Sequence, residues 1–101
     1  MKKSRVFFSR AAESDPPEVL SRKARAVLLR TGFIDGLAPE DFTALKIHFG
    51  EKGNIGYLKP SWLRGVVAEV KKKTPRAYLT DSNTLYTGPR SNSVEHIGLA
   101  W

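Results

Sequence analysis

The first segment whose residues could bind a ligand or transfer a proton is a strand-like run that leads into a loop with regularly spaced glycines. Residues 46–49 read Lys-Ile-His-Phe, and Gly50, Gly53 and Gly56 follow at every third position. An imidazole titrates near neutral pH and can move a proton, bind a metal or contact an anion. Glycines let backbone N–H groups come close to a ligand. The segment therefore predicts one half of a binding site around Lys46 and His48, although the same glycines also suit a tight structural turn.

The spacing of these glycines excludes two nucleotide-binding motifs. It is neither the G-x-G-x-x-G of dinucleotide-binding folds nor the phosphate loop that ends in Gly-Lys-Ser/Thr. A helix expected to begin near Pro60 offers its first amides to an anion instead. The loop thus predicts contact with an anionic or polar ligand without naming one.

The second such segment is the polar loop 80–92. The side-chain carboxylate of Asp81 and the side-chain amide of Asn83 can form hydrogen bonds with a polar ligand or form an Asx turn. A lysine inside a short strand needs a partner, and Asp81 can supply it to Lys46, either in a structural pair or in a substrate-binding pair. We expect Lys46 and Arg90 to hold negative charge, and His48 and Asp81 are the candidates for proton transfer. The predicted ligand-binding residues are Lys46, Gly50, Gly53, Asn54, Gly56, Tyr57, Asn83, Thr84, Tyr86 and Arg90.

No metal site is predicted. The sequence has no cysteine, so it supplies no thiolate for zinc or for an iron–sulfur cluster. His48 and His96, with the carboxylates near them in the sequence, show no recognisable spacing of metal ligands.

The elements that must position these loops alternate between strand and helix. In chain order, the pattern predicts a strand at 5–8, a helix at 16–30, a strand at 42–49, a helix at about 60–73, a strand at 77–80 and a helix opened by an Asn92/Glu95 capping box. This order is typical of an α/β fold, βαβαβα in two or three layers, with a small parallel sheet. Ligands in such sheets bind beyond the carboxyl ends of the strands, where both polar loops lie.

The length and net charge of the chain limit the classes of protein to which it can belong. The 101 residues form a single segment, 1–101, and their last helix stops at Trp101, so we expect a truncated larger domain whose open edge can self-associate. No apolar run reaches the length of a membrane span and no secretory leader is recognisable, which predicts a cytoplasmic protein. The net charge of +7 leaves a second hypothesis, a non-enzymatic basic module that binds nucleic acid or an acidic protein. Its Lys and Arg belong mainly to the predicted helices and not to the polar loops.

Both loops together resemble a known family. Residues 46–57, Pro60, residues 79–86 and residues 90–96 resemble the N-terminal part of the family catalogued as domain of unknown function 362. Many members are several times longer and carry a ferredoxin-type module, so the resemblance implies an iron–sulfur-associated redox context. It implies a [4Fe–4S] cluster only for longer members, and it attaches no reaction to the loops.

Overall fold

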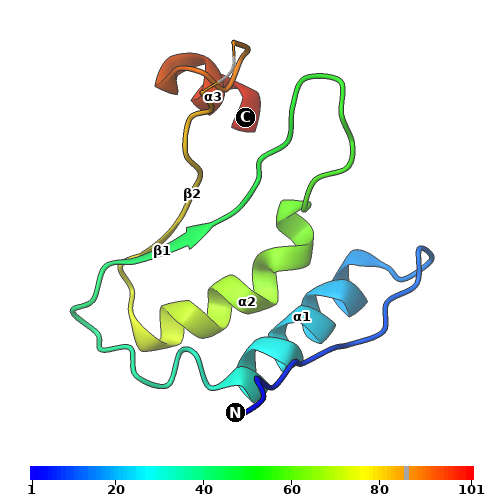
Figure 1. Cartoon of the computed structure of the whole chain (residues 1–101), viewed down its shortest axis with the longest axis vertical. Coiled ribbons are helices and arrows are strands. Elements are labelled where there is room, and N and C mark those ends of the chain that lie inside the picture. Colours follow the sequence, from blue (N-terminus) through cyan, green and yellow to red (C-terminus); the bar gives the residue numbers. More distant parts are fainter. Residues whose placement is uncertain (86) are drawn as a thin grey trace. The chain divides into compact units, whose positions relative to one another are not determined.

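The computed structural model describes residues 1–85 and 87–101. The elements are helix α1 (Pro17–Thr31), strand β1 (Thr43–Lys46), helix α2 (Pro60–Lys73), strand β2 (Ala77–Thr80) and helix α3 (Ser93–Ala100) (Figure 1). They belong to two compact units, one comprising residues 1–43 and 59–77 and the other residues 44–58 and 78–101. No helix among the described residues has both the length and the apolar character needed to cross a membrane.

The first unit is built on α1 and α2, which lie side by side (Figure 1). The Gly65 amide donates to Ser21 Oγ at 2.8 Å, and Arg25 Nε donates to Glu69 Oε1 at 2.6 Å. Because the partners advance by four residues on both helices, the two helices run parallel. Gly65 permits this approach, since a Cβ there would lie 2.9 Å from the Ser21 carbonyl oxygen.

Local sequence explains where these two helices begin and end. Each has proline in its first turn, where the fixed φ suits a helix and the missing N–H costs nothing. Helix α1 ends at Thr31 and is followed by Gly32, whose φ of 72° is the left-handed conformation that glycine adopts without strain. Helix α2 ends with three lysines, which complement the negative end of the helix dipole.

In the part of the chain that the structure describes, β1 and β2 form a two-stranded parallel sheet. The Thr43 amide donates to Arg76 O and the Ile47 amide to Thr80 O, so both chains advance together. This confirms the α/β class and the small parallel sheet, and β2 spans the predicted residues. The strand predicted at 42–49 is shorter, because the chains separate after the bond between Ile47 and Thr80.

The predicted first strand is not formed in the part of the chain that the structure describes. Residues 5–8 have no regular structure, and Val6 and Phe8 are exposed. The order is therefore αβαβα. The side chains of this segment favour extended structure, but a strand also needs a neighbouring strand that forms hydrogen bonds with its backbone amides and carbonyls.

Candidate functional site

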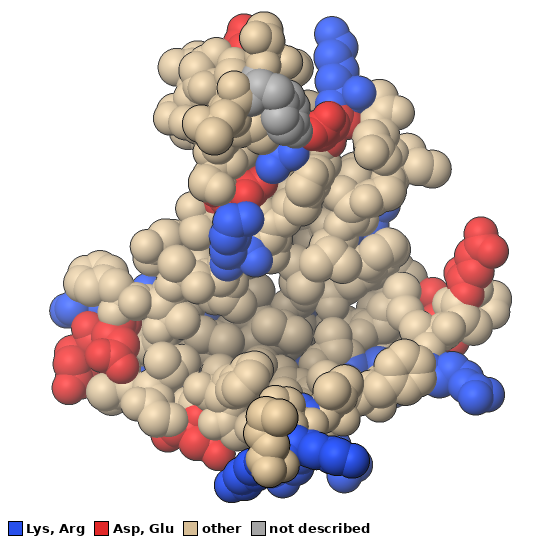
Figure 2. Space-filling view, viewed as in Figure 1, with Lys and Arg blue, Asp and Glu red and all other residues tan. Residues whose placement is uncertain are grey.

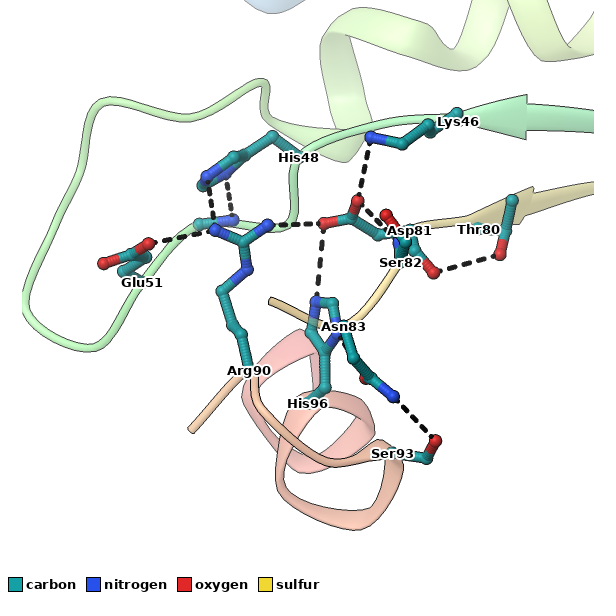
Figure 3. Close-up of polar contacts among 11 residues, drawn as sticks. Lys46, His48, Glu51, Thr80, Asp81, Ser82, Asn83, Arg90, Ser93 and His96 are labelled. Atoms are coloured by element: carbon teal, nitrogen blue, oxygen red, sulfur yellow. Dashed lines mark hydrogen bonds and ion pairs between the residues drawn. The ribbon is translucent and has the colours of Figure 1, made fainter. Parts of the chain in front are cut away.

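The centre of the second unit is Asp81, which directly follows β2 and whose side chain is 1% exposed. Its Oδ1 accepts from the Ser82 amide at 2.8 Å and from Lys46 Nζ at 3.2 Å. Its Oδ2 accepts from Arg90 Nη2 at 3.1 Å and lies 3.4 Å from His96 Nε2 (Figure 3). The carboxyl ends of both strands thus meet at one buried carboxylate, and the predicted pairing of Lys46 with Asp81 is confirmed.

These contacts fix the charge of Asp81. Burial by itself raises the pKa of the carboxyl, but the Ser82 amide and the charges of Lys46 and Arg90 outweigh it and lower the pKa to about 2. Lys46 is 68% exposed, so solvent screens its contribution, whereas the pair with Arg90 is buried on both sides. Asp81 is therefore ionised at neutral pH and serves as a fixed acceptor.

Arg90 links Asp81 to the loop of residues 50–56, which contains Gly50, Gly53 and Gly56 and is called the glycine loop below. Its Nη1 donates to Glu51 Oε1 at 2.9 Å and lies 2.9 Å from His48 Nε2, and its side chain is 10% exposed (Figure 3). His48 Nδ1 in turn accepts from the Gly50 amide at 2.8 Å. A neutral imidazole has one acceptor nitrogen, so the amide and the guanidinium compete for it and the tautomer decides which hydrogen bond forms. The predicted site residues His48, Asp81 and Arg90 are thus in one network.

Helix α3 contributes a residue that the sequence reasoning did not place in the site, His96. The Asn92 side chain caps the helix by accepting from the Glu95 amide at 3.0 Å, which confirms the predicted cap. This cap fixes the first turn and directs the buried His96 toward the loop after β2. Its Nδ1 donates to Asn83 Oδ1 at 3.1 Å, and its ring meets Phe49 edge to face at 5.8 Å between centroids. The signal was present in the sequence, because a capping box at 92–95 places residue 96 one turn into the helix.

A pocket of about 620 Å³ lies beside this network. One part of its lining is polar, with Ser82, Asn83 and Ser93 beside the buried Asp81 and His96. The rest is apolar and is supplied by Phe49, Leu79, Ile97, Ala100 and Trp101. Pockets of this size and mixed character hold small organic ligands in proteins.

The side chains and amides of the glycine loop mainly form hydrogen bonds within the loop itself. The Asn54 side chain accepts from the Gly56 amide at 2.7 Å, and the Asn54 amide donates to Glu51 O at 2.9 Å. Gly50 has a φ of 101°, and a Cβ there would lie 2.7 Å from the Tyr57 ring. Gly53, Asn54 and Gly56 are exposed and do not line the large pocket.

The other predicted ligand-binding residues take different places. Asn83 lines the large pocket, whereas Arg90 lines a smaller one of about 130 Å³ with Glu51 and Gly88. The Thr84 amide donates to Arg90 O at 2.8 Å and closes the polar loop. Tyr86 lies outside the described residues. Among those described, no three or more His, Asp or Glu side chains gather as a metal site would require.

Comparisons of the chain with protein-family models, with curated proteins and with solved structures give no match.

Proposed function

We propose that residues 44–58 and 78–101 bind a small, uncharged polar molecule that has an apolar or aromatic part. The observation that carries this proposal is the lining of the 620 Å³ pocket. Hydroxyl and amide groups from Ser82, Asn83 and Ser93 face a space whose other lining residues include Phe49 and Trp101. Such a lining satisfies a ligand with hydrogen-bonding groups at one end and a flat apolar face at the other.

The charge network favours an uncharged ligand over an anionic one. Lys46 and Arg90, the cations expected to hold an anion, both bind Asp81, and Arg90 also binds Glu51. An anion would have to displace a carboxylate from these pairs, and removing one partner from a buried ion pair is costly. The network therefore acts as a rigid support that orients His96 and the loop after β2.

The same network favours a role in ligand binding over a role for Asp81 in proton transfer. A carboxylate whose pKa is about 2 holds almost no proton near neutral pH and is a weak general base. His48 is the remaining candidate for proton transfer, but it does not line the large pocket. Binding of a ligand without a chemical reaction requires no proton transfer by Asp81 or His48.

The test is a titration followed by amide NMR with three neutral probes, adenosine, uridine and N-acetyltyrosinamide. We expect at least one to shift the resonances of residues 79–83 and 93–101 saturably. Replacing Asn83 with alanine should weaken that response, whereas replacing Asn54, a residue of the same type in the exposed loop, should not. If no probe at millimolar concentration moves these resonances, the pocket is not a ligand site.

The resemblance to domain of unknown function 362 supports a wider proposal, in which this binding unit serves an iron–sulfur-associated redox protein. The cluster thiolates would have to come from residues outside this sequence, which has no cysteine. Binding of nucleic acid or of an acidic protein is the alternative. On the face that Figure 2 shows, Lys and Arg side chains lie among Asp and Glu side chains and do not form a continuous basic surface.

A further inference from the structure

A second concave site lies in the other unit, between α1 and α2. It is a groove of about 450 Å³ that three arginines and two serines help to line. Its lining residues are Pro17, Glu18, Ser21, Arg22, Arg25, Ser61, Arg64 and Gly65. We call it the arginine groove. It shares no residue with the pocket described above and does not depend on the function proposed for that pocket.

The parallel packing of the helices gives the arginine groove its position. Ser21 pairs with Gly65 and Arg25 with Glu69, so Pro17 and Pro60, the first residues of α1 and α2, lie at the same end of the helix pair (Figure 1). Two aligned helix dipoles place two positive ends together; Glu18 in the first turn of α1 offsets one of them, whereas the first turn of α2 has no acidic residue. Neither helix has a side-chain cap at this end; the Val19 and Leu20 amides donate to Pro16 O, and the Trp62 amide donates to Lys59 O.

The arginines divide into one that is paired and two that face solvent. Arg25 is held by Glu69 at 2.6 Å and therefore fixes the wall of the groove. Arg22 and Arg64 are exposed, and no carboxylate among the described residues lies within ion-pair distance of either. Glu18 also lines the groove and opposes them, which leaves an excess of guanidinium over carboxylate in the lining. Guanidinium groups present paired N–H donors that match the oxygens of a phosphate group.

We propose that the arginine groove binds a phosphate group carrying two negative charges, either free or as a monoester, with Arg22 and Arg64 as its main contacts. Ser61, in the first turn of α2, lines the groove and adds a hydroxyl donor. The proposal rests on three features together, a concave space, two arginines without carboxylate partners, and two uncapped helix starts.

The test uses inorganic phosphate and phenyl phosphate, which separate a free anion from a phosphate ester. Each is titrated at constant ionic strength while the amides of residues 18–22 and 61–65 are followed by NMR. We expect saturable shifts there with at least one probe, and a loss of affinity of about tenfold or more in the double variant Arg22→Gln/Arg64→Gln. Inorganic sulfate added at the same ionic strength should compete, because it carries the same charge and geometry.

The matched control is the double variant Lys71→Gln/Lys73→Gln, which removes the same charge from exposed residues at the other end of α2. Its affinity should change less than about twofold. An equal loss in both double variants would show general charge attraction and overturn the proposal, as would the absence of shifts at residues 18–22 and 61–65. Both substitutions are on exposed side chains, and an unchanged NMR spectrum elsewhere checks that each variant is folded.

Discussion

Replacing Asp81 with asparagine should destabilise the second unit by an amount that depends on pH. The side chain is 1% exposed and contacts Lys46, Arg90 and His96. Asparagine keeps the shape and one acceptor oxygen, but it removes the negative charge. The substitution therefore removes the carboxylate charge and also places an amide NH₂ donor where one carboxylate oxygen accepted a hydrogen bond.

The magnitude follows from the pKa of Asp81. The contacts lower it from 3.8 to about 2, and this difference corresponds to roughly 2 kcal/mol of stability near neutral pH. Removing one partner of a buried ion pair usually costs more, about 3–5 kcal/mol. We expect the smaller figure, because Arg90 keeps its contact with Glu51 and Lys46 is mostly solvated.

The pH dependence has a defined sign. The folded pKa lies below the unfolded one, so the stabilisation is complete above the unfolded value and is lost as the pH falls through the folded value. The difference in unfolding free energy between the wild-type protein and Asp81→Asn should fall to about half near pH 3. At still lower pH it should approach zero, since the wild-type carboxyl then becomes neutral too.

The assay is urea unfolding followed by the NMR signals of residues 78–101, at several values between about pH 3 and pH 7. Asp35→Asn, the same change at an exposed residue, is the control and should shift stability by less than about 0.5 kcal/mol. A difference for Asp81→Asn that stays constant over this pH range would refute the reasoning, as would one below about 0.5 kcal/mol near neutral pH.

The remaining predictions concern local packing and capping. Gly65→Ala should destabilise the first unit by about 1–3 kcal/mol despite the better helix propensity of alanine, because the new Cβ would lie 2.9 Å from Ser21 O. Gly98→Ala in α3 meets nothing within 4 Å and should instead stabilise by about 0.5–1 kcal/mol; equal effects of the two changes in thermal unfolding would contradict this account. Asn92→Ala should cost about 1 kcal/mol by removing the cap on the Glu95 amide, and faster hydrogen exchange in α3 measures it; unchanged exchange rates would exclude that role.

Much of the secondary structure could be predicted because its signals are local. Proline in the first turn and glycine after the last turn mark α1, and the Asn92/Glu95 pair marks the start of α3. The strand predicted at 5–8 is wrong for the opposite reason. Its side chains favour extended structure, but only a neighbouring strand can satisfy its amides, and no local pattern reports whether one exists.

The candidate site was partly predictable from the order of strands and loops. Polar residues after parallel strands meet at one edge, which brings Asp81 close to Lys46. Sequence did not reveal that Arg90 neutralises the same carboxylate, or that His96 completes the network from α3. The sequence predicted an anionic or polar ligand from the positions of Lys46 and Arg90, but it could not show that both side chains pair with Asp81.

The sequence by itself determined the class of the fold and the starts of its helices, since both follow from neighbours within a few residues. The tertiary structure decided the parallel packing of α1 on α2, which depends on Gly65 approaching Ser21 from 44 positions along the chain. It also decided the charge state of Asp81, because burial and opposing charges set a pKa only when distant side chains come together. Periodicity and capping are properties of a segment, whereas electrostatic balance and the lining of a pocket are properties of the folded chain.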